Sequence, residues 1–232
     1  MSHEPYSHKS LKSKQREIRD QFHPNLGLRV HRSLSWLQRS EYAKGDHDCS
    51  FLFLWIAFNA AYSQEIPKFN DYTERGIFQE FLEKILSLDH TGAIYNAIWQ
   101  KFSGPIRLIM NNQFVYNPFW QHHNGITGYE DWEAKFLRSK TRLNDAIVRK
   151  DTLTVLGNLF DRLYVLRNQL VHGGATWNSK VNRAQVKDGA EILGALLPIF
   201  LDLMMDNPQI EWPAPNYPVV ESLGRQPYSY RV

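Results

Sequence analysis

TLTVLGNLFDRLYVLRNQLVHGG (152–174) predicts one long helix with an apolar seam. The seam consists of leucines three or four residues apart, a spacing that brings them to one face of a helix: Leu156, Leu159, Leu163, Leu166 and Leu170. Such a face packs into a core or a dimer interface. We expect the helix over 151–172, because Gly173 and Gly174 follow it, and glycine adopts the left-handed C-cap conformation without a β-carbon clash.

Further helices are predicted on both sides of this one, and no useful segment alternates with the period of a strand. They are expected at 26–44, 48–63, 72–88, 92–102, 129–149 and 180–206. The segment 48–63 is apolar nearly all round, so other helices should surround it, and Asp46 or Asp48 can cap its first turn. An all-α single domain follows.

The positions of the predicted helices also indicate where the domain begins and ends. Residues 25–206 are expected to form the domain, after a polar arm at 1–24. Within the domain, 103–128 is rich in Pro, Gly and Asn, which predicts a loop-rich insertion with one short helix near 105–112. Residues 207–232 contain five prolines and should form an extended, irregular tail.

Composition limits the class of protein. Of the 232 residues, 43% are hydrophobic and 13% aromatic, which is ample for a packed core. Cys49 is the single cysteine, so an internal disulfide or a cysteine-rich metal site is excluded, and we expect a reducing, cytoplasmic location. No segment has the pattern of a secretory signal or the length of a membrane span. The net charge of +3 is only mildly favourable for an anionic partner.

The segment RNQLVHGG carries side chains suited to phosphate chemistry. A guanidinium holds two phosphate oxygens with its planar fork, and an imidazole titrates near neutral pH, so Arg167 and His172 suit a phosphodiester transition state. At about 100° per residue, Asp161, Asn168 and His172 fall within about 40° on the helix. Arg167 lies about 140° from His172, so it must reach around the helix or across a dimer. The alternative is structural, because cations in a last turn also stabilise the helix dipole.

RNQLVHGG resembles the Arg-polar-x3-His element of the HEPN superfamily, a group of helical nucleotide-binding and ribonuclease domains. The spacing here is Arg-x4-His. Residues 32–63, RSLSWLQRSEYAKGDHDCSFLFLWIAFNAAYS, are similar to the N-terminal helical pair of several bacterial HEPN families, with a Trp on the first helix, an Asp before the second and a WIAFNA-like core. The resemblance implies a helical bundle that forms a homodimer, with the two motifs facing a shared cleft.

The resemblance also implies roles for three catalytic residues. His172 is expected to act as general base or acid on the ribose 2′-OH or the 5′-oxygen leaving group. Arg167 is expected to stabilise charge on the phosphorane, and Asn168 to orient the imidazole or the scissile phosphate. The products would be a 2′,3′-cyclic phosphate and a 5′-hydroxyl. No metal and no cofactor is expected.

The predicted function is therefore a metal-independent endoribonuclease that cuts RNA, serving as an antiviral defence or toxin–antitoxin effector. An antitoxin or a nucleotidyltransferase is a further possible partner. One alternative is a catalytically inactive HEPN domain that binds RNA, a nucleotide or a protein. Another is a plain helical scaffold in which RNQLVHGG is only a C-cap.

The sequence contains other polar residues that could belong to a site. Arg32 and Arg39 share one helix face and could bind the RNA backbone, although surface salt bridges would explain them equally well. The pair His122-His123 is not expected to bind a metal, because adjacent histidines point in different directions. Asn59 interrupts an apolar helix, so we expect a hydrogen bond to another helix.

Overall fold

The computed structural model describes residues 6–65, 74–180 and 182–220. These residues form ten α-helices and no strand, which confirms the predicted all-α fold. Three short helical turns accompany them, at Arg19–Gln21, Ala97–Lys101 and Gln113–Val115. The α-helices are α1 (His8–Ile18), α2 (Pro24–Tyr42), α3 (His47–Tyr62), α4 (Glu74–Leu88), α5 (Ala93–Asn96), α6 (Ser103–Met110), α7 (Asn117–His123), α8 (Trp132–Val148), α9 (Thr152–Val171) and α10 (Arg183–Asp206).

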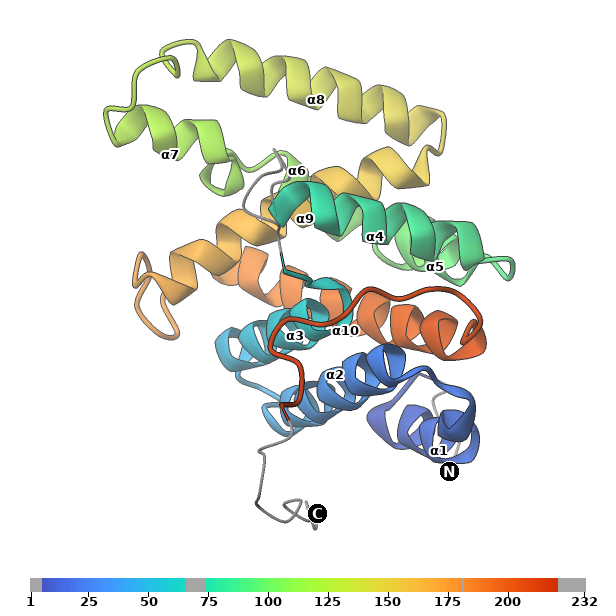
Figure 1. Ribbon diagram of the computed structural model, residues 1–232. Coiled ribbons are helices and arrows are strands. Elements are labelled where there is room, and N and C mark those ends of the chain that lie inside the picture. The colour runs from blue at the N-terminus through green and yellow to red at the C-terminus, as the bar shows by residue number, and fades with distance from the viewer. Residues whose placement is uncertain (1–5, 66–73, 181, 221–232) are drawn as a thin grey trace.

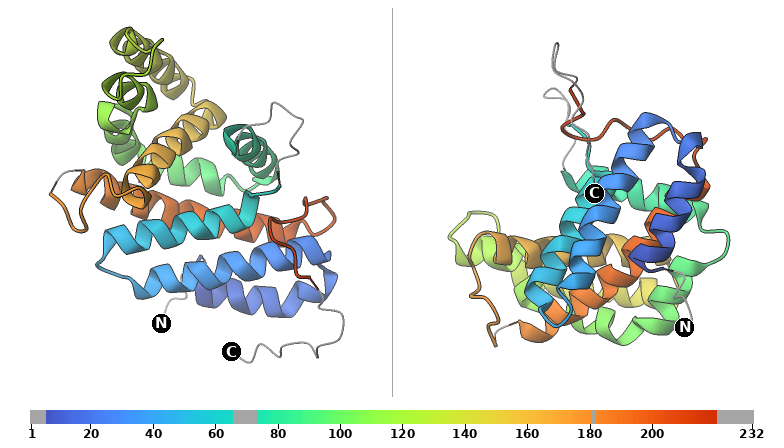
Figure 2. Two further views of the ribbon diagram at one scale, coloured as in Figure 1. Left: turned by 60° about the vertical axis from the view of Figure 1, so that its left-hand side comes forward. Right: turned by 90° about the horizontal axis from the view of Figure 1, so that it is seen from below.

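The helices are stacked from one end of the molecule to the other (Figure 1). Helices α7 and α8 lie at one end, and α1 and α2 lie at the opposite end. Between them are α3, α4, α9 and α10, and the left view of Figure 2 shows the same order. In the part of the chain that the structure describes, no helix combines the length and the apolar character of a membrane span.

An aromatic cluster on α3 forms the centre of the core. The Phe58 ring is fully buried, and its centroid lies 4.6 Å from that of Phe160 on α9 and 4.5 Å from that of Tyr62. Phe81 of α4 and Phe200 of α10 also contact Phe58. One side chain thus ties α3 to three other helices, which agrees with the prediction that this helix is surrounded.

Helix α9 is positioned by close packing and by its cap. Asp151 accepts a hydrogen bond from the Thr154 N–H at 3.0 Å, so the helix begins where a carboxylate can satisfy a free amide. A β-carbon at Gly189 of α10 would lie 3.1 Å from side-chain atoms of Leu163 and Phe51. The glycine therefore lets α10 approach both α9 and α3.

The prediction of a polar arm at 1–24 was wrong for the part that the structure describes, because residues 8–21 are helical. Helix α1 begins with a capping box at Ser7 and buries Leu11 against the core. The Lys14 ammonium lies 2.6 Å from the Asp202 carboxylate and 2.7 Å from that of Asp206, both on α10. A few apolar and ionic contacts to a distant helix are enough to order this segment, and its own composition does not reveal them.

The prediction for 103–128 was only partly right. The expected short helix is present as α6, but the stretch also contains the turn Gln113–Val115 and helix α7. Pro118 is placed in the first turn of α7, where the missing N–H of proline costs no hydrogen bond. Proline therefore starts a helix here instead of breaking one.

The tail is irregular from Asn207 to Val220, as predicted, and the remainder of 207–232 lies outside the described residues. Arg29 of α2, almost fully buried, fastens it by donating to the carbonyls of Pro213 at 2.9 Å and Ala214 at 3.2 Å. A third hydrogen bond reaches the carbonyl of Ala61 at 2.8 Å. Burial lowers the pKa of Arg29 to about 10, so the side chain remains cationic at neutral pH.

We expect Arg29→Ala to lower the free energy of unfolding by about 3 kcal/mol, because it opens a cavity and leaves the Ala61 carbonyl without a donor. Urea denaturation measures this loss, and hydrogen exchange should show faster exchange over 210–217. The control is Arg39→Ala on the same helix, expected to cost less than about 1 kcal/mol. Equal losses in the two variants would show that Arg29 does not hold the tail.

Candidate functional site

The C-terminal end of α9 is a glycine-terminated cap. Gly173 has a φ of 70°, in the left-handed region. Its N–H donates to the Leu170 carbonyl at 3.3 Å, and the Gly174 N–H donates to the Gln169 carbonyl at 2.7 Å. These two bonds form a Schellman motif and confirm the predicted glycine stop. His172 is the C-cap residue, so its side chain leaves the helix at the point where the chain turns away.

Arg167 and Asn168 are brought together within one chain. The Nη1 of Arg167 donates to the Oδ1 of Asn168 at 2.9 Å, and both residues are half-buried. The long arginine side chain therefore reaches around the helix to the face of Asn168. Since Oδ1 accepts this bond, the Nδ2 hydrogens of Asn168 remain available as donors; no other described residue accepts from them.

His172 is exposed to solvent. Its backbone N–H donates to the Asn168 carbonyl at 3.0 Å, which fixes the residue one turn beyond Asn168. The imidazole makes no hydrogen bond to any residue described by the structure. The His172 ring can therefore contact a ligand that arrives from solvent. It takes no part in the hydrogen bond between Arg167 and Asn168.

The loop after the motif is fastened to the start of α3. Asp48 is buried and accepts from the Arg183 guanidinium at 2.6 Å and from the Asn178 N–H at 3.1 Å. The hydrogen bond from Arg183 to Asp48 raises the pKa of Arg183. Asp46 accepts from the indole N–H of Trp177 at 3.1 Å. The two carboxylates therefore tie Trp177, Asn178 and Arg183 to the N-terminus of α3.

Asp46 also caps α3, by accepting from the Cys49 N–H at 3.0 Å, as predicted. This backbone hydrogen bond is the largest cause that lowers the pKa of Asp46 from its ordinary value of 3.8. A carboxyl with a lowered pKa stabilises the fold fully above its unfolded pKa. We therefore expect the cap and the tie to Trp177 to weaken only as the pH falls below 3.8.

We expect Asp48→Ala to loosen the loop and to cost about 2 kcal/mol of stability, because the Arg183 cation and the Asn178 N–H lose their shared acceptor. Hydrogen exchange over 174–180 measures the loosening. Asp131→Ala is the matched control, since Asp131 is exposed, solvent screens its ion pairs with Lys135 and Arg138, and exchange over 174–180 should not change. Unchanged exchange in Asp48→Ala would contradict the tether.

A pocket of about 690 Å³ opens beside the last turn of α9. Gln169 lies in its wall, donating to the Phe114 carbonyl and accepting from the Asn182 amide at 3.1 Å. Gly174 and Trp120 also line it. The hydrogen bonds of Gln169 link three separate segments of chain, so the backbone next to RNQLVHGG is firmly held.

The structure does not bring the predicted RNA-binding residues to this site. Arg32 donates to the carbonyls of Asn216 at 3.0 Å and Tyr217 at 2.7 Å, so it holds the tail. The Arg39 guanidinium lies over the Phe53 ring at 5.3 Å. Both arginines belong to α2, and α3 lies between α2 and α9 (Figures 1 and 2).

Asn59 does not make the predicted bond between helices. Its Oδ1 is buried and has no hydrogen-bond partner among the described residues. His122 and His123 belong to an aromatic group, in which the His123 ring stacks on Phe119 at 4.1 Å. Across the described ranges, no three His, Cys, Asp or Glu side chains gather closely enough to hold a metal ion.

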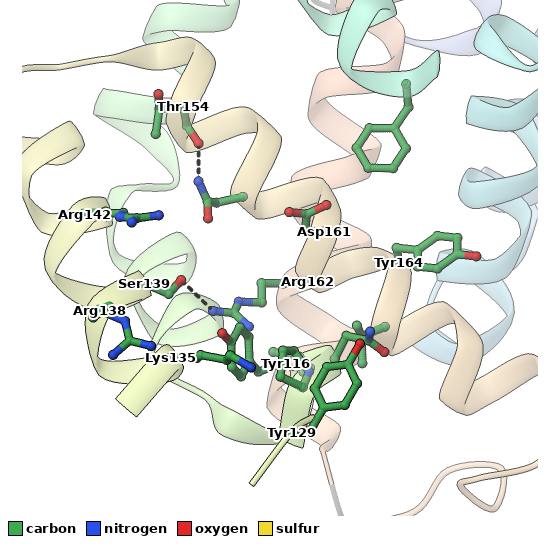
Figure 3. A pocket seen from close by; sticks show the side chains of 16 residues that line it. Tyr116, Tyr129, Lys135, Arg138, Ser139, Arg142, Thr154, Asp161, Arg162 and Tyr164 are labelled. Carbon is green, nitrogen blue, oxygen red and sulfur yellow. Dashed lines mark hydrogen bonds between the residues drawn. The ribbon is translucent and has the colours of Figure 1, made fainter. Parts of the chain in front are cut away.

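The sequence analysis missed a basic pocket between α8 and α9 (Figure 3). Lys135, Arg138 and Arg142 line it from α8, and Arg162 lines it from α9. A signal was present, because positions 135, 138 and 142 are three and four residues apart and so share one helix face. The spacing of these residues on α8 could not predict that α9 lies opposite them and closes the pocket.

Comparison of the chain with known proteins finds no match among family models, curated proteins or solved structures. The resemblance to HEPN domains therefore depends on the residues of this chain, and assignment to that family is part of the proposal below.

Proposed function

We propose that the protein is a metal-independent endoribonuclease of the HEPN type. The observation that carries the proposal is the hydrogen bond between Arg167 and Asn168. It places a guanidinium on the side of α9 that also presents Asn168, one turn before the exposed His172. A cation, an amide donor and a titratable ring at one helix end are the groups that transesterification of RNA requires.

The proposed reaction begins with attack of the ribose 2′-oxygen on the adjacent phosphorus. A general base removes the 2′ proton, the bond between phosphorus and the 5′-oxygen breaks, and a general acid protonates that oxygen. His172 serves as one of these groups. Arg167 stabilises charge on the phosphorane, and the Nδ2 of Asn168 donates to a phosphate oxygen. Cleavage leaves a 2′,3′-cyclic phosphate and a 5′-hydroxyl.

The reaction needs a base and an acid, whereas each chain supplies one histidine at the motif. A homodimer with the two motifs at a shared cleft supplies the second imidazole. Two exposed apolar side chains near the motif support such an interface: Val171 is 50% exposed and Trp177 72% exposed. Large apolar groups at a surface gain stability when a partner covers them. Light scattering on the purified protein tests for the dimer.

The test of the function is incubation of the purified protein with total RNA in excess EDTA. We expect cleavage, and we expect the new ends to carry 2′,3′-cyclic phosphates and 5′-hydroxyls. Cleavage that stops when EDTA is added, or that leaves 5′-phosphates, would contradict the mechanism. Binding of RNA without cleavage by a folded dimer would favour the inactive binding domain. A role in defence or as a toxin, restrained by an antitoxin or nucleotidyltransferase, belongs to the same proposal.

A further inference from the structure

The pocket between α8 and α9 has a volume of about 810 Å³ and is rich in positive charge. Its lining includes four cations and one carboxylate: Lys135, Arg138, Arg142, Arg162 and Asp161. Figure 3 shows the side chains of α8 extending across the opening toward α9. A volume of this size lies within the range of roughly 300–1,000 Å³ that is usual for small-ligand sites.

The cations differ in their surroundings. Arg162 is 4% exposed, its guanidinium carbon lies 4.3 Å from the centroid of the Tyr116 ring, and its Nη2 donates to Ser139 at 3.4 Å. It therefore forms part of the rigid floor. Lys135 and Arg138 share Asp131, which lies 2.7 Å from the Lys135 ammonium and 3.5 Å from the Arg138 guanidinium.

Arg142 has no hydrogen bond or ion pair to any residue that the structure describes, and it is exposed at the pocket. Arg138 is also exposed, with one long ion pair to Asp131. Two guanidinium groups one helical turn apart can together hold a phosphate, since each presents a planar fork of donors. A cation such as Arg142 that has no acidic partner among the described residues, inside a pocket rich in positive charge, favours an anionic ligand.

The other lining groups fit a nucleoside. The rings of Tyr116 and Tyr129 border the pocket. The Arg162 guanidinium covers one face of Tyr116 and the Lys135 ammonium lies 5.3 Å from the centroid of Tyr129, so a base stacks on the ring faces that these cations leave open. Asp161 can accept a hydrogen bond from a ribose hydroxyl or from a base amine. The amide of Asn158, which donates to the Thr154 carbonyl at 2.8 Å, gives the wall a further fixed polar group.

We propose that this pocket binds a nucleotide unit of RNA, with its phosphate held by Arg138 and Arg142. The proposal deepens the ribonuclease function and rests on it, because the bound unit flanks the one that is cut. Asp161 and Asn168 are seven residues apart on α9, so they share a face and are separated by about 10 Å along the axis. A single RNA strand that lies along this face of α9 extends from the pocket to RNQLVHGG.

The experiment measures binding of a fluorescein-labelled single-stranded RNA decamer by fluorescence polarisation. All proteins carry His172→Ala, so the probe is not cut. Adding Arg138→Ala and Arg142→Ala is expected to raise the Kd at least about tenfold, because two charge-assisted contacts are lost. The dependence of log Kd on log salt concentration should fall by about 1.4 units of slope.

The matched control replaces two exposed arginines outside the pocket lining, Arg107→Ala and Arg149→Ala, in the same background. It removes the same charge and should change the Kd by less than about twofold. Thermal unfolding checks that both double variants are folded. Equal weakening in the two variants would mean that only net charge matters, and no weakening in the pocket variant would mean that RNA binds elsewhere; either result overturns the proposal.

Competition with AMP and with inorganic phosphate shows whether the bound phosphate belongs to RNA, to a free nucleotide or to free phosphate. We expect AMP to displace the decamer only at millimolar concentration and inorganic phosphate to be weaker still. Displacement by AMP as tight as the binding of the decamer would identify a free nucleotide as the ligand and overturn the placement of RNA. If only the ribonuclease proposal fails, the wild-type protein leaves RNA uncut in the cleavage assay, while Arg138→Ala and Arg142→Ala still weaken binding of the decamer. The two failures are therefore distinguishable.

Discussion

Replacement of His172 by Ala should lower the rate of RNA cleavage by about 100- to 10,000-fold, the usual contribution of a general acid or base. The cleavage assay contains excess EDTA, and initial rates are compared with those of the wild type. The fold should tolerate this change, because the imidazole is exposed and has no hydrogen bond within the described residues. The C-cap bonds come from the backbone of Gly173 and Gly174 and remain in place.

The control for this prediction is His90→Ala, which removes another exposed histidine, in the turn after α4. It should cleave RNA at the wild-type rate. If His172→Ala also cleaves at the wild-type rate, the imidazole takes no part in proton transfer and the proposed mechanism fails.

The helical pattern of the chain could be predicted because it depends on local spacing. The segments expected at 151–172 and 180–206 correspond to α9 and α10, and the glycine stop at Gly173 is present in the left-handed conformation. In each case the apolar period or the cap lies within a few residues. The error at 1–24 has the opposite cause, because α1 is held by contacts to α10 that are distant in sequence.

The surroundings of the candidate site could not be predicted for the same reason. The tie between Asp48 and Arg183 joins residues 135 positions apart, and the bonds from Arg32 to the tail span more than 180. The angle of about 140° between Arg167 and His172 follows from the ideal helical rotation of about 100° per residue. It could not include the length of the arginine side chain, which reaches Asn168 within the chain.

Arg167→Ala is the second substitution with a large expected effect, a loss of about 100- to 1,000-fold in kcat, as for removal of a donor to a developing oxyanion. Arg167→Lys should recover only part of this loss, since an ammonium lacks the planar fork that bridges two phosphate oxygens. Loss of the bond to Oδ1 also leaves Asn168 without its orienting donor. Asn168→Ala should therefore impair cleavage less than Arg167→Ala does.

Growth provides the cellular measurement for Arg167. An active ribonuclease should slow the growth of cells that overproduce it, and Arg167→Ala should relieve this effect at equal protein abundance. Arg149→Ala removes an exposed arginine after α8 and should leave the wild-type toxicity unchanged. Persistent growth arrest with Arg167→Ala would separate toxicity from cleavage. Because Arg167 contacts Asn168 at the surface end of α9, a structural role alone predicts wild-type toxicity in any variant that remains folded, whereas a catalytic role predicts relief.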